Sequence, residues 1–231
     1  MDMALRPHFA MDFDGTICPS DATDSLFDTF ATPEWRAIED RCVAGEMTSR
    51  ECISREVELF RATPEELEQA VAKLSIDSDV PDFVAAARRY GATVSVVSDG
   101  FDLFIHPLLR AAGLDLPVSA NTMLQMGADG WKAAFANGAE GCGSGTCKCK
   151  ATSGRHPLVL IGDGRSDFCL ARRADFVLAK GKLATYCAQE GIPHIAITNF
   201  ADALALLPTI MAEISPTIPT SLDVSFESSN A

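Results

Sequence analysis

Three short apolar segments of this chain each end in an acidic turn that contains glycine. They are residues 7–11 before DFDGT, residues 92–97 before SDG, and residues 158–161 before GDG. Short β-branched runs with little polar alternation are typical of strands buried on both faces of a parallel sheet. The carboxyl ends of such strands meet at one edge of the sheet, so we expect the three acidic turns to form one site.

Segments with helical periodicity lie between and after these strands. Three of them stop at a glycine, which is a frequent helix terminator. The segments are residues 82–90 before Gly91, 101–112 before Gly113, 168–174, and 183–189 before Gly191. The alternation of strands and helices predicts an α/β fold built on an open parallel sheet.

Residues 20–79 show a different pattern, with amphipathic helical segments and no convincing strand. The helical segments are residues 23–30, 33–44, 49–60 and 64–74. Thr48 or Ser49 can cap the third, and Thr63-Pro64-Glu65-Glu66 is a typical helix start. We therefore expect residues 20–79 to form a helical cap inserted into an α/β core of residues 1–19 and 80–214. Residues 215–231 are rich in Ser, Thr and Pro, and we expect a poorly ordered tail there.

The charge balance limits the kind of partner that this chain can bind. Its net charge of −13 argues against nucleic acid and anionic membranes, because those partners need clustered Lys and Arg. A small anionic substrate remains compatible, since a metal ion and a few cations can reverse the local sign. With no secretory signal and no apolar run of the roughly 20 residues that span a bilayer, we expect a cytoplasmic protein. The sequence does not indicate an oligomeric state.

The eight cysteines are expected to be free thiols rather than a disulfide framework. Cys142, Cys147 and Cys149 form one group that can be interpreted as a metal site. The group lacks the paired CxxC spacing of structural zinc sites, and no histidine pair lies nearby in the sequence. A glycine-rich loop that carries thiols is the alternative interpretation.

Asp12 and Asp14 lie two residues apart directly after the first strand, and two such carboxylates repel each other unless a cation lies against them. Cleavage of a phosphate ester would use this pair. The Asp12 carboxylate can attack phosphorus and form an aspartyl-phosphate. Asp14 can protonate the leaving oxygen and later deprotonate the attacking water.

Mg²⁺ suits a site of hard oxygen ligands and would offset the repulsion between carboxylate and phosphate. The candidate metal ligands are Asp12, Asp14, Asp163 and Asp167. The candidate phosphate-binding groups are Ser98, Asp99 and Gly100 with their backbone, and Lys148. Lys150 competes with Lys148 for the phosphate.

Four segments together resemble the haloacid dehalogenase superfamily of aspartate-nucleophile phosphatases. They are DFDGTI at 12–17, VVSDG at 96–100, the lysine of GTCK at 145–148, and IGDGRSD at 161–167. The resemblance implies a Rossmann-like core, with Asp12 as nucleophile, Asp14 as acid and base, and Asp163 and Asp167 at Mg²⁺. The helical insert resembles the cap of the phosphoserine-phosphatase-like branch.

The continuation of the last segment, GDGRSDFCLARRADFVLAKGKL, is similar to a subgroup of methionine-salvage phosphatases. TSREC at 48–52 is similar to SSREC-like segments in the caps of that subgroup. The resemblance implies 2-hydroxy-3-keto-5-methylthiopentenyl-1-phosphate as substrate. The GDGxxDFC pattern is also similar to phosphoethanolamine and phosphocholine phosphatases, so these substrates are alternatives.

Phosphoserine phosphatases carry a cap arginine that pairs with the substrate carboxylate. Our alignment places Glu56 there, beside Arg55, and an acid would repel that carboxylate, although a shift of one residue would reverse the argument. Where the family's cap glutamate binds an amino group, this chain has Asp21. The candidate substrate contacts in the cap are Asp21, Asp24, Arg50 and Arg55, and solvated helix charges are the alternative interpretation.

Other functions fit these residues less well. A dehalogenase has no leaving alkoxide to protonate, so Asp14 would be idle. A phosphonate hydrolase needs a Schiff-base lysine in the cap, where the only lysine between residues 18 and 80 is Lys73. A non-catalytic module that binds a phosphorylated ligand stays open, as does a phosphotransferase.

Overall fold

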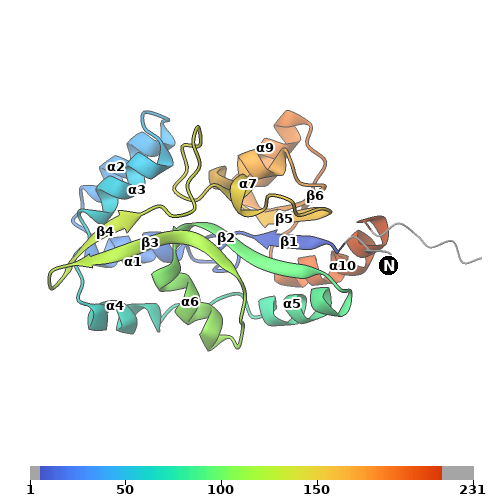
Figure 1. Ribbon diagram of the computed structural model, residues 1–231, viewed down its shortest axis with the longest axis horizontal. Helices are drawn as coiled ribbons and strands as arrows, with labels where there is room; N and C mark the ends of the chain where they lie inside the picture. The colour runs from blue at the N-terminus through green and yellow to red at the C-terminus, as the bar shows by residue number, and fades with distance from the viewer. Residues whose placement is uncertain (1–5, 215–231) are drawn as a thin grey trace, which may run out of the picture.

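The computed structural model describes residues 6–214, and its centre is a seven-stranded sheet with the order β4-β3-β2-β1-β5-β6-β7 (Figure 1). The strands are β1 His8–Met11, β2 Thr93–Phe101, β3 Val118–Met126, β4 Gly130–Ala134, β5 Leu158–Gly162, β6 Phe176–Ala179 and β7 Ile195–Ala196. All neighbouring strands are parallel except β3 and β4, which form an antiparallel hairpin. The predicted open parallel sheet is therefore confirmed.

The central strands are buried on both faces because their alternate residues enter two separate apolar clusters. Phe9 and Met11 of β1 pack in one cluster, and Ala10 between them packs in the other. β5 alternates in the same way, with Ile161 on the first face and Leu160 on the second. Burial on both faces removes the polar alternation of a half-exposed strand, which explains the apolar runs in the sequence.

Helices cover both faces of the sheet (Figure 1). The helices outside the insert are α5 Val80–Arg89, α6 Asp102–Ala111, α7 Lys148–Ala151, α8 Phe168–Ala171, α9 Gly181–Glu190 and α10 Phe200–Ile214, with a 3₁₀ turn η1 at Arg165–Asp167. α5, α6 and α10 lie on one face, and α7 and α9 lie on the other (Figure 1). Gly91, Gly113 and Gly191 follow three of these helices with φ between +66° and +79°, a conformation that favours glycine.

The predicted helical insert is present as α1 Ala22–Phe30, α2 Trp35–Val43, α3 Ser49–Val57 and α4 Pro64–Val71. Thr48 and Thr63 begin α3 and α4 with reciprocal capping boxes to Glu51 and Glu66. The insert shares its apolar core with the sheet. The ring of Phe27 stacks on Phe101 of β2 at 6.2 Å between centroids. This shared packing fixes the base of the insert against the ends of the central strands.

Several elements were not predicted from the sequence. These are the β3–β4 hairpin, β6, β7, α7 and α10. β7 has two residues and α7 has four, too few for a periodic pattern. In residues 6–214 no helix is long and apolar enough to cross a membrane. The tail expected at 215–231 lies outside the described residues.

His8 is a buried polar side chain on the central strand β1, 4% exposed. Its ring nitrogens lie 2.7 Å from Thr93 Oγ1 and 2.8 Å from Ser95 Oγ, both on β2. Burial, with a smaller effect from the positive charge of Arg155, lowers the pKa of His8 from 6.5 to about 4. The ring therefore stays neutral in the folded protein at a pH where the unfolded chain would protonate it.

Acidification should destabilise the protein through His8. Between pH 6.5 and about 4 the unfolded state binds a proton on His8 that the folded state does not. The contribution of neutral His8 to the free energy of unfolding is therefore fully present above this pH range and is lost as the pH falls through it. The full loss is roughly 3 kcal/mol. Urea unfolding at pH 7.5 and 4.5 would measure it, with His8→Gln as the comparison. Equal acid sensitivity in both proteins would contradict this origin.

Candidate active site

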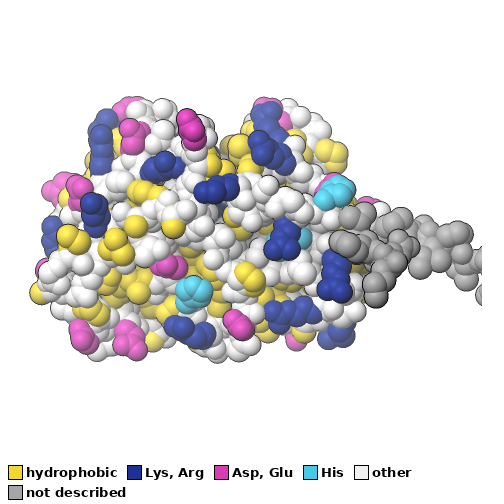
Figure 2. Space-filling model, viewed as in Figure 1, with side chains coloured by type: hydrophobic (Ala, Val, Ile, Leu, Met, Phe, Trp, Pro, Cys, Tyr) yellow, Lys and Arg dark blue, Asp and Glu magenta, His cyan; other side chains and the backbone are white. Residues whose placement is uncertain are grey.

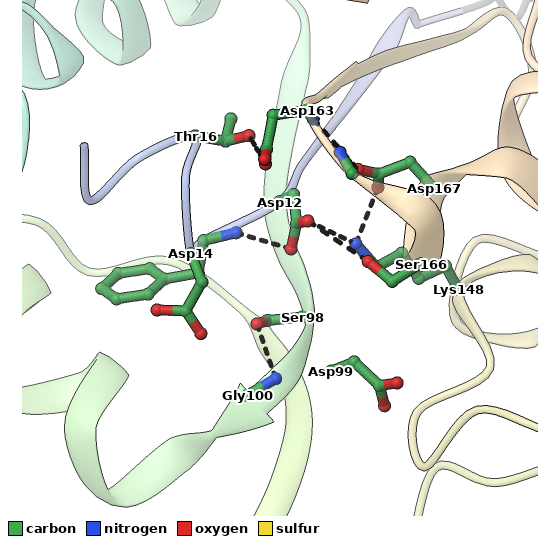
Figure 3. Close-up of polar contacts among 12 residues, drawn as sticks. Asp12, Asp14, Thr16, Ser98, Asp99, Gly100, Lys148, Asp163, Ser166 and Asp167 are labelled. Carbon is green, nitrogen blue, oxygen red and sulfur yellow. Dashed lines mark hydrogen bonds and ion pairs between the residues drawn. The ribbon is translucent and has the colours of Figure 1, made fainter. Parts of the chain in front are cut away.

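The three acidic turns meet at one edge of the sheet, as predicted (Figure 3). Met11 pairs in register with Val96 of β2 and Ile161 of β5. The residues that follow these positions therefore leave the sheet together. The backbone N–H of Asp12 donates to the carbonyl of Ile161 at 2.9 Å, which holds the first turn against the third.

Asp12 lies at the centre of this edge and is 5% exposed. Its Oδ1 accepts a hydrogen bond from the backbone N–H of Phe13 at 2.7 Å, and its Oδ2 lies 2.8 Å from Lys148 Nζ. The Ser166 hydroxyl approaches Oδ2 at 3.4 Å (Figure 3). Burial and the neighbouring Asp167 raise the pKa of Asp12 well above its ordinary value, and Lys148 opposes this effect.

Lys148 bridges two carboxylates, because its Nζ also lies 2.7 Å from Asp167 Oδ1 (Figure 3). It is 3% exposed. Burial alone would lower the pKa of Lys148, but Asp12 and Asp167 outweigh burial and raise it above its ordinary value. Lys150, the competitor, is exposed and donates to the carbonyl of Gly138 at 2.8 Å. The structure therefore places Lys148 between the carboxylates, while Lys150 is an exposed residue of the cleft wall.

Asp12, Asp163 and Asp167 can offer three oxygens that lie within 4.8 Å of one another. The Thr16 hydroxyl orients Asp163 by donating to its Oδ1 at 2.8 Å. The backbone N–H groups of Asp163 and Gly164 donate to Asp167 Oδ2. Burial is the largest cause of a raised pKa at Asp163. Three hard oxygen donors with one lysine among them fit a small divalent cation such as Mg²⁺.

Asp14 was predicted to join this metal group, but the structure places its carboxylate elsewhere. The backbone N–H of Ala22 donates to Asp14 Oδ1 at 2.9 Å, and the Thr23 hydroxyl donates to Oδ2 at 2.8 Å. The positive φ of Gly15, 71°, turns the chain directly after Asp14 toward the insert. Burial raises the pKa of Asp14, although the bonds from Thr23 and Ala22 oppose the increase. The side chain of Asp14 is therefore held by the start of α1 and does not join the cluster of Asp12, Asp163 and Asp167.

Ser98 and Gly100 lie beside Asp12, but the side chain of Asp99 turns away (Figure 3). Asp99 Oδ2 accepts from the Ser49 hydroxyl at 2.5 Å, and Oδ1 accepts from the backbone N–H of Thr146 at 2.8 Å. The side-chain amide of Asn121 donates to the carbonyl of Asp99 at 2.6 Å. The Asp99 carboxylate therefore ties the second turn to α3 and to the loop before Lys148. The predicted contact of the Asp99 backbone with phosphate stays a prediction.

A cleft of about 1600 Å³ opens over this site. Its walls come from α2 and α3, from the loop at 139–150, and from the start of α9. In Figure 2 the corresponding hollow separates the lobe of α2 and α3 from the lobe of α9. Acidic side chains outnumber basic ones along the walls, so an anionic substrate needs a cation at the site.

The cap candidates divide into two groups. Asp21 and Asp24 line the cleft, while Arg50 and Arg55 are not among its lining residues. Arg50 donates to the carbonyls of Ala139, Cys142 and Ser144 and so holds the loop at 139–144. Arg55 is exposed. The interpretation of Arg50 and Arg55 as substrate contacts is therefore not supported by their positions.

Glu56, which the alignment placed at the cap arginine of phosphoserine phosphatases, lines the cleft and is 7% exposed. Burial is the main cause of a pKa raised to about 7. Arg165 of the third turn reaches the cap and donates to the carbonyls of Cys42 and Val43, at the end of α2. Glu56 is therefore an acid on the cap wall of the cleft, and Arg165 links the third turn to the cap.

The thiols of Cys142 and Cys147, in the loop before Lys148, and of Cys149, on α7, do not form a metal group with other ligands in residues 6–214. All eight cysteines are free, as expected. Cys147 is buried, and Cys142 is half-buried. The loop interpretation of these thiols is therefore favoured.

Several supporting residues were missed by the sequence analysis. Thr16, Thr23 and Thr146 donate to carboxylates, and Asn121 donates to the backbone carbonyl of Asp99. Lys180 Nζ donates to the carbonyl of Gly15 at 2.9 Å. Thr16 stands inside the DFDGTI segment and could have been proposed from the motif. Asn121 lies on β3, which had no sequence signal, so its role was visible only after folding.

A sequence model of haloacid dehalogenase-like hydrolases matches residues 9–172. The chain belongs to this family. It is a hydrolase by that membership, and the match covers all four segments on which the resemblance rested. The predicted fold class and family are thus confirmed.

Curated relatives of this family member include proteins named 2-hydroxy-3-keto-5-methylthiopentenyl-1-phosphate phosphatase. The protein from Exiguobacterium is 28% identical over 212 residues, which cover 88% of this chain and 98% of the relative. The one from Lysinibacillus sphaericus is 28% identical and covers 94% of this chain and 100% of the relative. The similarity therefore extends over the insert as well as the core.

Solved structures of phosphoserine phosphatases share the fold. A phospho-aspartyl intermediate analogue of one such enzyme has a TM-score of 0.65 at 17% identity, with 87% of this chain and 98% of that chain covered. The enzyme from T. onnurineus has a TM-score of 0.65 at 16% identity, with 90% and 97% covered. Identities this low establish the common architecture and leave the substrate to other arguments.

Proposed function

We propose that this hydrolase is a Mg²⁺-dependent phosphomonoesterase that acts on a small phosphorylated metabolite through a phospho-Asp12 intermediate. The observation that carries the proposal is the close grouping of Asp12, Lys148, Asp163 and Asp167, of which Asp12 and Asp163 line the cleft and the other two are buried behind them. A carboxylate nucleophile, a fixed cation and a set of metal ligands are what transfer of a phosphoryl group requires.

In the proposed reaction, Asp12 forms a bond from its carboxylate oxygen to phosphorus while the bond to the leaving oxygen breaks. Asp14 gives its proton to that leaving oxygen. Asp14 then takes a proton from a water molecule that attacks the phospho-Asp12 phosphorus. Cleavage of the phosphorus–Asp12 bond restores the Asp12 carboxylate, leaves Asp14 protonated for the next cycle, and releases phosphate. Mg²⁺, when bound, would supply the positive charge that lets an anionic ester approach Asp12.

The chain's own groups would hold the phosphate during these steps. Lys148 lies against Asp12 and offsets negative charge. Ser98 is 1% exposed and lies at the same edge, where its Oγ accepts from the N–H of Gly100 at 3.0 Å. The Ser98 hydroxyl can donate to a phosphate oxygen while it keeps this bond.

The cap wall indicates the substrate class. Within residues 20–79 the cleft is lined by several acids, including Glu39 and Glu56, and by no lysine or arginine. A substrate carboxylate would have no cationic partner on that wall, which disfavours phosphoserine. The relatives' names and their similarity across the insert favour a methylthio-ketose phosphate. The acidic wall itself favours a second candidate, an amine-bearing ester such as phosphoethanolamine.

Phosphate release from a substrate panel tests the proposal. The panel contains a methylthio-ketose phosphate analogue, phosphoethanolamine, phosphocholine, phosphoserine and p-nitrophenyl phosphate, each assayed with Mg²⁺ and with excess chelator. We expect release that depends on Mg²⁺, with the methylthio-ketose phosphate as the best substrate and phosphoserine among the poorest. Binding of a phosphate analogue without turnover of any ester would favour a non-catalytic module. Transfer of the phosphoryl group to an added alcohol in place of water would favour a phosphotransferase.

Gly100→Ala tests the role of Asp14 through its position. A Cβ on Gly100 would overlap Asp14 Oδ2 and would lie 3.0 Å from Thr23 Oγ1 and 3.2 Å from Ser98 Oγ. The Asp14 carboxylate must therefore shift from its present position, which would disturb its alignment with the leaving oxygen. We expect kcat to fall about 100-fold for an alkyl phosphate, whose leaving oxygen needs a proton. The fall in kcat should be much smaller for p-nitrophenyl phosphate, because its leaving group needs no proton. An equal fall in kcat for both substrates would contradict the assignment of Asp14 as the acid.

A further inference from the structure

A second group of possible metal ligands lies in the cap, separate from the carboxylates of the active site. Glu39 and Cys42 are three residues apart on α2, and Cys52 and Glu56 are four residues apart on α3. Both spacings place a pair on one face of its helix, and α2 packs against α3. Glu39, Cys42 and Cys52 can each offer a ligand atom within 4.8 Å of the others.

The contacts within this group are close to those of atoms that share one metal ion. Cys52 Sγ lies 3.2 Å from Glu56 Oε1 and 3.6 Å from Glu39 Oε2. A sulfur and an oxygen bound tetrahedrally to one Zn²⁺ are separated by about 3.6 Å, given bonds of about 2.3 and 2.1 Å. The separation of 3.6 Å between Cys52 Sγ and Glu39 Oε2 matches this value. The separation of 3.2 Å between Cys52 Sγ and Glu56 Oε1 is shorter, so a bound ion would require the Glu56 carboxylate to move slightly outward.

The charges of the group also call for a cation. Cys52 is 1% exposed and Glu56 is 7% exposed. Across residues 6–214 no lysine or arginine forms an ion pair with Glu39 or Glu56. Arg165 comes near Cys42, but its guanidinium donates to backbone carbonyls. A buried carboxylate such as Glu56 is costly without a cationic partner, and the half-buried Glu39 lies beside the same thiol. No step of the proposed reaction uses these side chains.

We infer that Glu39, Cys42, Cys52 and Glu56 bind a thiophilic divalent cation, of which Zn²⁺ is the representative, in the cap wall of the cleft. Two thiols and carboxylate oxygens form a donor set that Zn²⁺ prefers and that Mg²⁺ does not. Binding would release the two thiol protons to solvent. Because each helix contributes two ligands, the ion would join α2 to α3.

Cobalt titration tests this inference independently of catalysis. Fully reduced protein is saturated with Mg²⁺ and then titrated with Co²⁺, which gives an ultraviolet thiolate-to-metal band only when sulfur is a ligand. We expect one equivalent of Co²⁺ to produce this band, and Zn²⁺ to displace it and to raise the thermal unfolding midpoint. The active-site carboxylates contain no sulfur and cannot produce the band.

Variants decide which thiols bind. Cys42→Ser/Cys52→Ser should abolish the band, while Cys149→Ser/Cys169→Ser, a second neighbouring pair of thiols, should leave it unchanged. Should the first variant not fold, Glu39→Gln keeps both thiols and should weaken Co²⁺ binding at least tenfold. A missing band in the wild type, a band that persists without Cys42 and Cys52, or unchanged affinity in Glu39→Gln would overturn the inference.

Discussion

Asp12→Asn should reduce phosphate release by about 10⁴-fold or more, because the amide cannot act as the nucleophile that forms the phospho-enzyme. The fold should persist. Asn keeps the shape of the side chain, and its oxygen can still accept the N–H of Phe13. Lys148 would retain Asp167 as a partner at 2.7 Å, so we expect the free energy of unfolding to fall by no more than about 1 kcal/mol.

The measurement is steady-state phosphate release with the best panel substrate, alongside urea unfolding of both proteins. Asp82→Asn is a matched control, because Asp82 is an exposed residue in the first turn of α5 and does not line the cleft. It should keep wild-type turnover. Activity retained in Asp12→Asn would overturn the covalent mechanism. The unfolding curve shows whether the variant is folded, and so distinguishes loss of the nucleophile from loss of the fold.

Lys148→Met should have the second large effect, on both turnover and stability. The lysine is buried between Asp12 and Asp167, and its removal leaves two buried carboxylates without their shared cation. With chelator present, we expect the free energy of unfolding to fall by about 3 kcal/mol. Saturating Mg²⁺ should recover part of this loss, because a bound cation would take over some of the neutralisation. With Mg²⁺ present, kcat should fall about 10³-fold.

Lys150→Met is the matched control for this variant. Lys150 lies on the same short helix α7, but it is exposed and donates to the carbonyl of Gly138. We expect it to change kcat by less than about twofold, since most surface substitutions have small effects. Comparable losses in the two variants would show that the charge of the loop matters and that the bridge between Asp12 and Asp167 does not.

The sequence by itself determined the central strands, the helical insert and the edge of the sheet where the chemistry lies. Apolar runs that end in acidic turns specify two-sided burial followed by exposure, and that local pattern is readable without a structure. The first and third turns supplied Asp12, Asp163 and Asp167, and all three lie together. The helix ends at Gly91, Gly113 and Gly191 were also local, since a positive φ favours glycine.

Only the tertiary structure decided which way several side chains face. Asp14 and Asp99 belong to the acidic turns in the sequence. Hydrogen bonds from the start of α1 nevertheless hold the Asp14 carboxylate, and Ser49, fifty residues away in the chain, holds that of Asp99. In the same way, packing of α2 on α3 brings Cys42 near Cys52 and Glu56. Spacing along the chain fixes which face of one element a residue occupies, but contacts between elements depend on packing that no local pattern encodes.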